Sequence, residues 1–147
     1  MNNSRYSGML SSIIKDSKLY LDKPYIKIAW NGKESILINH FRGFATYEEI
    51  SEIGIRILQA VEIEKAKKVL YDARGLEILD DKSRTYIVED FAQLMADAGV
   101  EYAATVFPQD VFARDSISQI RDSLKYLSDV NQFFGSVTKA LEWLRSM

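Results

Sequence analysis

Cysteine is absent from the 147 residues, and histidine occurs once, as His40. Disulfide bonds and cysteine nucleophiles are therefore excluded. A zinc site is disfavoured because zinc in proteins prefers several thiolate and imidazole ligands. A cysteine-free chain also suits a reducing compartment. We expect a cytoplasmic protein with no metal centre, in which His40 is a partly buried histidine at the end of a strand.

Motifs for phosphate binding and nucleophilic catalysis are missing as well. The seven glycines are isolated and match neither a dinucleotide-binding fingerprint nor a P-loop, and no G-x-S-x-G elbow presents a serine to His40. The tight acidic pairs, Asp80-Asp81 and Glu89-Asp90, are better explained as helix caps or solvated faces than as a magnesium or calcium site. We predict that the chain is not an enzyme and binds no cofactor.

An excess of charge and a long apolar run are also lacking. Lysine and arginine number 19 against 21 acidic residues, for a net charge of −2, which argues against nucleic acid as a partner. No apolar run approaches the ~20 residues that a membrane-spanning helix needs. The N-terminal segment lacks the pattern of a signal peptide. We therefore expect neither a nucleic-acid partner nor a transmembrane segment.

The composition provides the core of one globular domain. Hydrophobic residues make up 47% of the chain and charged residues 27%, the balance of an ordinary folded protein. Residues 1–17 are polar and rich in serine, which predicts a loose N-terminal arm. The remainder, residues 18–147, is predicted to be a single domain.

Alternating apolar residues predict that the sheet begins with a hairpin. The alternating segments 25–30 and 36–41 flank Asn31-Gly32, a strong turn signal. Pairing the even-numbered residues of both strands on one face needs a loop of odd length, so the register stays open. A short edge strand is predicted at residues 19–21, before the hairpin.

The rest of the chain alternates between helical patterns and short apolar runs. Thr46 and Glu49 form a capping box that begins the first helix. The predicted fold is α/β, with a mixed sheet of about 4–6 strands that starts with the hairpin and is flanked by about four helices. Further strands are predicted at residues 68–72, 103–107 and 131–134, and further helices at 81–98, 110–127 and 136–144, the first of these with an inner stripe of Ile87, Phe91, Leu94, Met95 and Ala98.

Three stretches of sequence resemble the SpoIIAA-like proteins, a branch of the STAS superfamily that is also akin in fold to CRAL-TRIO lipid-transfer domains. The likeness covers nearly the whole chain after about Leu19 and implies a mixed sheet flanked by helices. It also implies non-enzymatic work, since the best understood members antagonise anti-sigma factors and switch by serine phosphorylation. The stretches are Trp30-Asn31-Gly32 with Phe41-Arg42-Gly43-Phe44; Leu70-Tyr71-Asp72-Ala73-Arg74-Gly75-Leu76; and Val106 to Arg114, with a closing Ala140-Leu141-Glu142-Trp143-Leu144.

The phosphorylation motif of that family is altered here. Its Asp-Ser-Ser-Gly stretch corresponds to Asp80-Asp81-Lys82-Ser83, in which Asp80 matches the family's aspartate. Lys82 stands at the phosphoacceptor position, and Ser83 comes one position late. Ser83 is at most a doubtful phosphorylation site, and the pattern favours a residue in the first turn of a helix.

Polar residues follow the predicted parallel strands, where α/β sheets usually bind their ligands. One interpretation is a surface that contacts an anion or a partner, because arginine offers a rigid fork for carboxylate or phosphate. The alternative is that Asp72 and Arg74 hold their own loop while Arg114 pairs with a neighbouring acid. The candidates for partner or anion binding are Arg42, Asp72, Arg74, Asp110 and Arg114, with Pro108 and Gln109 on the same edge.

Two functional hypotheses remain. The first is a non-catalytic, STAS-like regulatory or interaction module that binds a protein partner, or its own copy as a homodimer, through the strand ends. The second is a carrier or sensor of a small apolar or amphipathic, lipid-like ligand. For the second role, aromatic residues are candidates to line a pocket, although they also suit an ordinary core: Phe107, Phe112, Phe133, Phe134 and Trp143.

Overall fold

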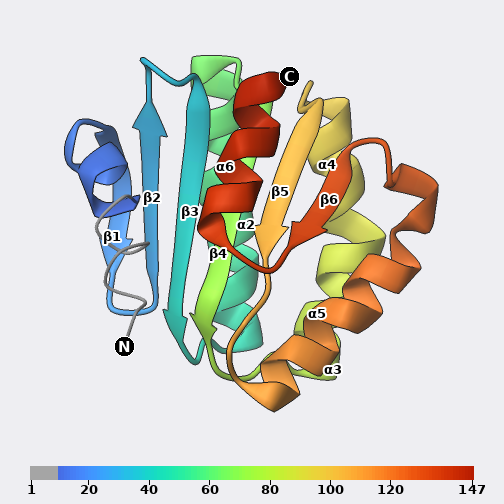
Figure 1. Ribbon diagram of the computed structural model, residues 1–147. Coiled ribbons are helices and arrows are strands. Elements are labelled where there is room, and N and C mark those ends of the chain that lie inside the picture. Colours follow the sequence, from blue (N-terminus) through green and yellow to red (C-terminus); the bar gives the residue numbers. More distant parts are fainter. Residues whose placement is uncertain (1–9) are drawn as a thin grey trace.

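The computed structural model describes residues 10–147. Six strands form one sheet in the order of the sequence (Figure 1). The first three pair antiparallel and the last four pair parallel, so the predicted mixed sheet that begins with a hairpin is confirmed. The strands are β1 (Lys18–Lys23), β2 (Ile26–Asn31), β3 (Ile36–Gly43), β4 (Lys68–Leu76), β5 (Tyr102–Val106) and β6 (Asn131–Phe134).

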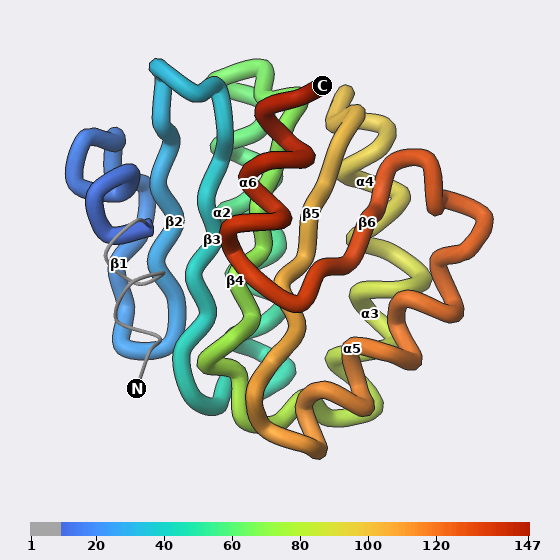
Figure 2. Tube along the Cα trace, viewed as in Figure 1, coloured from blue at the N-terminus to red at the C-terminus, as the bar shows by residue number. Residues whose placement is uncertain are grey.

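Helices cover both faces of this sheet. One face packs against α2, α4 and α5, and the other against α6, which crosses the front of the sheet in Figures 1 and 2. Each face has its own apolar cluster, as expected for parallel strands buried on both sides. The helices are α2 (Tyr47–Glu64), α3 (Asp81–Tyr86), α5 (Val111–Ser123) and α6 (Val137–Ser146), with a π-helix η1 (Ile87–Phe91), the α-helix α4 (Ala92–Asp97) and a 3-10 turn η2 (Lys125–Leu127).

The predicted N-terminal arm contains a helix. Residues 10–15 are helical, and Leu10 is buried in the same apolar cluster as α6. The amide of Asn31 donates a hydrogen bond to the carbonyl of Ile13, at 3.0 Å. This part of the segment expected to be a loose arm is thus helical, and its apolar side chains help to cover the sheet. The first nine residues of the arm lie outside the described part of the chain.

The sequence left the register of the hairpin open. The structure shows why: the first four residues of β3 are all buried, so apolar alternation does not mark one face of this strand. In the structure Ile28 lies opposite Asn39 and Trp30 opposite Leu37, across a four-residue loop. The even-numbered residues of β2 thus share a face with the odd-numbered residues of β3. No bulge is required, and His40 faces the side of the sheet that α6 covers.

The predicted second helix is interrupted by η1. The amide of Ala92 donates to the carbonyl of Ile87, five residues earlier, which is the bonding of a π-helix. The extra residue in this turn rotates the inner stripe of the helix. As a result Phe91 and Met95 are buried, but Leu94 is 46% exposed and its predicted burial is wrong.

The helix α2 is held at both ends by local interactions. Thr46 accepts from the amide of Glu49 at 3.2 Å and Glu49 accepts from the amide of Thr46 at 2.9 Å, which confirms the capping box. At the other end Lys65 adopts a left-handed conformation with φ of 54°. An L-residue with a side chain pays for this conformation, whereas glycine does not.

Replacing Lys65 by glycine should therefore stabilise the protein. We expect Lys65→Gly to raise the free energy of unfolding by about 1 kcal/mol, measured by denaturant titration. Glu62→Gly, on the exposed side of the last turn of α2, is the control and should lower it by about 1 kcal/mol. Equal loss of stability in both variants would contradict the assignment of the helix end.

Candidate functional site

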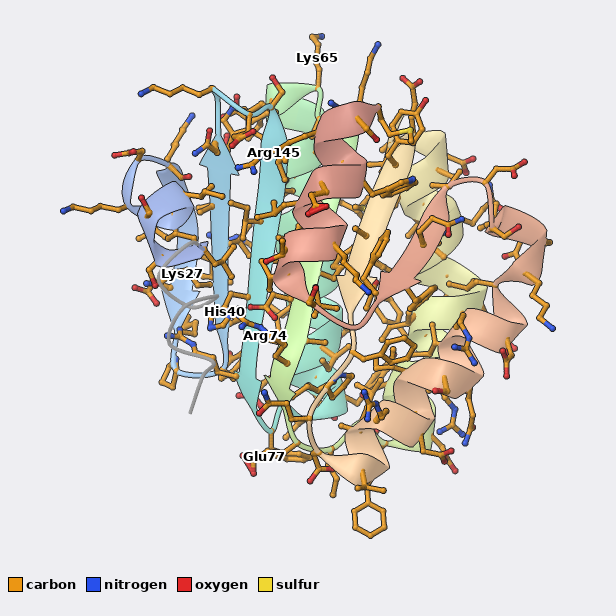
Figure 3. The ribbon with its side chains drawn as sticks, in the orientation of Figure 1. Lys27, His40, Lys65, Arg74, Glu77 and Arg145 are labelled. Carbon is orange, nitrogen blue, oxygen red and sulfur yellow. The ribbon has the colours of Figure 1, made fainter. Side chains whose placement is uncertain are left out.

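The loops that follow β3, β4 and β5 lie side by side at the edge of the sheet that is formed by the carboxyl ends of its parallel strands. The amide of Glu77 donates to the carbonyl of Gly43 at 3.0 Å, and the amide of Gln109 donates to the carbonyl of Arg74 at 3.2 Å. Figure 3 shows Arg74 and Glu77 toward this edge and Lys65 at the opposite end. This is the edge at which α/β sheets usually bind their ligands.

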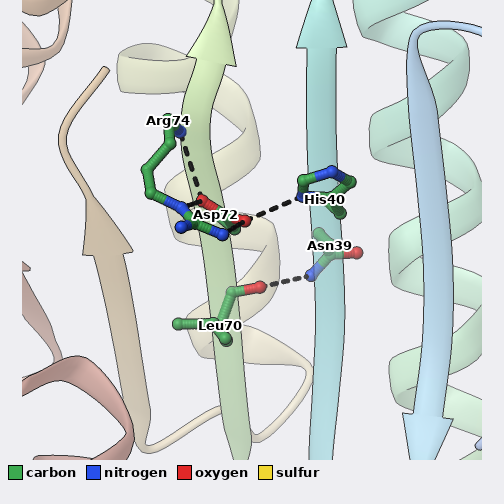
Figure 4. A network of polar contacts seen from close by, with 5 residues as sticks. All are labelled: Asn39, His40, Leu70, Asp72 and Arg74. Carbon is green, nitrogen blue, oxygen red and sulfur yellow. Dashed lines mark hydrogen bonds and ion pairs between the residues drawn. The ribbon is translucent and has the colours of Figure 1, made fainter. Parts of the chain in front are cut away.

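A network of three side chains joins β3 to β4 just before this edge (Figure 4). His40 and Asp72 are paired in the parallel register, and His40 Nδ1 lies 2.8 Å from Asp72 Oδ2. Arg74 donates to the same carboxylate twice, from Nε to Oδ1 and from Nη2 to Oδ2, both at 2.9 Å. The backbone amide of Arg74 adds a bond of 3.2 Å to Asp72 Oδ1.

Asp72 is a buried, fixed negative charge. Its side chain has no exposed surface. Burial alone would raise the pKa of this carboxyl group, but the hydrogen bonds from His40 and Arg74 outweigh burial and lower the pKa to about 2. A buried charge needs such partners to be tolerated. Asp72 and Arg74 therefore bind each other and hold the loop after β4, which is the second of the two interpretations of the sequence. His40 also belongs to this network, although no signal in the sequence connects it with Asp72.

Arg42 and Asp110 also have local structural partners. Arg42 lies at the predicted edge because β3 and β4 are parallel, but its Nη2 donates to Asp22 Oδ1 at 3.2 Å and to the carbonyl of Lys23 at 2.5 Å. Asp110 accepts from the amide of Ala113 at 3.0 Å and caps α5. The structure thus directs Arg42 toward the β1–β2 turn and does not gather the five candidates into one anion site.

Arg114 stacks on an aromatic ring. Its guanidinium carbon lies 5.9 Å from the centre of the Phe107 ring, and that of Arg121 lies 5.6 Å from the same ring. Arg114 is exposed on α5 and forms no ion pair with a residue in the range 10–147. The pairing of Arg114 with an acid, the alternative drawn from the sequence, is therefore wrong.

The hydroxyl group of Ser83 is not accessible to a kinase in this conformation. It lies in the first turn of α3, as its pattern predicted, and its amide donates to Asp80 Oδ1 at 2.7 Å. The residue has no exposed surface, and its hydroxyl has no hydrogen-bond partner among residues 10–147. A phosphate group would not fit at this position without opening the helix end.

Four large apolar side chains are exposed at the strand ends, and we call them the strand-end face. Phe44 follows β3 and is 51% exposed, Ile78 follows β4 and is 48% exposed, and Val111 and Phe112 follow β5 and are 75% and 74% exposed. From the sequence, Phe112 was a candidate for a pocket or for the core, and the other three were not singled out as exposed residues. The signal was available for α5, because Val111 and Phe112 lie outside its inner stripe.

The pocket predicted from five aromatic residues does not form. The ring centres of Phe107 and Phe133 lie 6.0 Å apart on the side of the sheet that α5 covers. Phe134 packs against Trp143 of α6 on the other side, and Phe112 is exposed. Adjacent residues of a strand point to opposite faces, so Phe133 and Phe134 cannot line one pocket.

The network of His40, Asp72 and Arg74 orients side chains and holds a loop, but it contains no nucleophile. Within residues 10–147, no group of three or more histidine, cysteine, aspartate or glutamate residues is placed to hold a metal ion. In the same range no helix is long and apolar enough to cross a membrane.

Comparisons with known proteins locate the fold. No protein-family model and no curated protein matches the sequence. An uncharacterised protein of the DUF3478 family from Shewanella loihica PV-4, described as having a SpoIIAA-like fold, has a TM-score of 0.49 and 16% identity over 87% of this chain and 91% of that one. The anti-sigma factor antagonist SpoIIAA, in its unphosphorylated form, has a TM-score of 0.52 and 11% identity over 89% of this chain and 99% of that one. The chain has the SpoIIAA fold. The fold that the sequence resemblance implied is thereby confirmed.

The ion network predicts a specific loss of stability in acid. Because the pKa of Asp72 is lowered from 3.8 to about 2, its contribution is present in full above about pH 4 and is lost as the pH falls through 2. Between about pH 5 and pH 1, the wild type should lose about 2 kcal/mol more unfolding free energy than Asp72→Asn.

Chemical denaturation at a series of pH values measures this difference. Asp122→Asn is the matched control, because its ion pair with Arg121 is exposed and should contribute little. Identical acid dependence of the wild type and Asp72→Asn would show that the carboxylate is not ionised in its buried position.

Proposed function

We propose that this protein is a non-catalytic, STAS-type regulatory or interaction module that binds a protein partner through the strand-end face. The observation that carries the proposal is the exposure of Phe44, Ile78, Val111 and Phe112 on three adjoining loops. Large exposed apolar side chains gathered in one region are typical of interaction surfaces. Aromatic residues such as the two phenylalanines often contribute most of the binding energy.

Charges around the strand-end face indicate the chemistry of the partner. The same loops expose Glu77, Asp80 and Asp110. A partner with an apolar patch bordered by lysine or arginine would complement this arrangement, and its charges would speed association. Arg114 lies beside Asp110 on the same edge and belongs to the proposed surface. Asp72 and Arg74 do not contact the partner in this proposal; they hold the loop after β4 in place.

The fold adds a second line of support. SpoIIAA is described as an antagonist of an anti-sigma factor, so this fold serves at least one protein that acts by binding another. A second copy of this chain is the other partner that we consider, because β1 is the edge strand of the sheet among the described residues. The proposal assigns the protein to the cytoplasm and leaves serine phosphorylation out of its mechanism.

The strand-end face can be tested with exposed residues that do not hold the fold together. We expect the double variant Phe44→Ser and Phe112→Ser to lose at least tenfold in partner retention, because it removes the two aromatic anchors. The measurement is quantitative affinity purification from the natural host, followed by titration of the retained partner. Sedimentation of the purified chain tests self-association in parallel.

Ile63→Ser is the matched control for this experiment. Ile63 is 64% exposed in the last turn of α2, at the other end of that helix from the strand-end face. The control should bind partners like the wild type. A partner or a self-association that survives the double variant unchanged would place the interaction elsewhere on the molecule.

A further inference from the structure

An apolar cavity of about 110 Å³ lies between the sheet and the helices α2, η1, α4 and α5. Aliphatic and aromatic side chains form almost all of its wall, and no charged residue in the described part of the chain lines it. Protein interiors contain few voids larger than a water molecule. Apolar cavities only slightly larger than this one stay dry and bind benzene.

The cavity reaches the centre of the sheet. Tyr71 on β4 and Thr105 on β5 both line it, and both keep some accessible surface although helices cover the two faces of the sheet. Burial raises the pKa of Tyr71, so its phenol stays neutral. A neutral hydroxyl group in an apolar wall suits a guest that is mainly hydrophobic.

A surface groove of about 500 Å³ adjoins the cavity between α2 and the η1–α4 segment. Tyr86 lines both the groove and the cavity and so stands between them. Its hydroxyl lies against Gly54 of α2, where any side chain at position 54 would overlap it. The π-helix η1 begins at the next residue, and π-helical turns are frequent at functional sites.

Aromatic rings surround Tyr86. The Tyr86 ring lies 6.3 Å from that of Tyr47 in an edge-on arrangement and 6.1 Å from that of Phe91. Phe91 in turn packs edge-on against Tyr71, at 6.3 Å. A flat aromatic ring can join such a series with favourable edge-to-face contacts, which an alkyl chain does not make.

The charged residues of the groove indicate which polar group a bound molecule would carry. Glu89 and Asp90 are exposed on its edge, and neither forms an ion pair with a residue in the range 10–147. None of the described residues of the groove is basic. The charge of Asp90 also reaches Tyr86, where it adds to the effect of burial in raising the pKa of the phenol. The groove therefore favours a cationic group and disfavours a carboxylate.

We propose that the cavity and groove form a binding site for a small aromatic amine. The ring occupies the cavity behind Tyr86, and the ammonium group remains in the groove beside Glu89 and Asp90. The site is separate from the strand-end face and does not depend on the proposed function. It narrows the ligand-carrier hypothesis to one chemical class and excludes fatty acids, whose carboxylate would meet the two acidic side chains.

The test compares two probes that share a ring and differ in charge. We expect 2-phenylethylamine to bind the intact protein with a millimolar or better Kd, and 3-phenylpropionate to bind at least tenfold more weakly. Titrations followed by backbone amide NMR give both affinities and locate the site. Absence of amine binding up to about 10 mM, or equal binding of the two probes, would overturn the proposal.

Two variants test the two parts of the site. Ala92→Leu fills the cavity from α4 and should weaken binding of the amine at least tenfold; Ala96→Val replaces it if that variant does not fold. Glu89→Gln with Asp90→Asn should weaken the amine about fivefold at low salt and leave the anionic probe no weaker. Glu101→Gln with Asp129→Asn makes the same change in charge on other exposed elements and should have no effect. Unchanged amine affinity in the cavity or the groove variant would show that the ring or the charge lies elsewhere.

Discussion

Burial of β3 and β4 on both faces is the constraint on which the rest of this structure depends. A sheet whose central strands are apolar on both sides must be covered on both sides. The larger cover comes from α2, α4 and α5, and the smaller one from α6 together with residues 10–15. The same constraint governs Asp72, because a charge in such a strand persists only with partners such as His40 and Arg74.

The helices α2, α4 and α5 do not fill all the space on their side of the sheet, and the space left between them and the sheet is the apolar cavity. The π-helical turn rotates the end of the α3–α4 segment, which leaves Leu94 outside and the cavity behind Tyr86 unfilled. An empty apolar cavity lowers stability because its wall lacks contacts on one side. A protein that retains such a cavity beside a groove is suited to bind a guest there.

The strand-end face and the cavity lie in different parts of the molecule. The strand-end face is made of loops and of the start of α5, whereas the groove runs along the middle of α2. The His40–Asp72–Arg74 network belongs to the opposite face of the sheet and supports the loop after β4. The residues that hold the loop after β4 therefore differ from those that we propose to contact a partner, and a change in one set need not alter the other.

Local sequence signals predicted the elements whose causes are local. The capping box at Thr46 and the cap at Asp110 each depend on residues within a few positions, and both are found where they were expected. The hairpin forms, but Asn31 is the last residue of β2, opposite Ile36, and the loop consists of residues 32–35. The composition excluded disulfides in the same direct way. The mixed sheet followed from the order of the elements and from resemblance in three separate stretches.

Only the tertiary structure decided which residues meet. The hairpin register was ambiguous because alternation has no meaning in a strand buried on both sides. The partner of Asp72 on β3 is His40, 32 positions away, and only the parallel register of β3 and β4 brings the two together. The π-helical turn left no local signal, yet it determined which side chains of α4 face inward and where the cavity lies. The sequence by itself thus determined the elements and the fold class, because their causes are local, whereas the site geometry depends on contacts between distant segments.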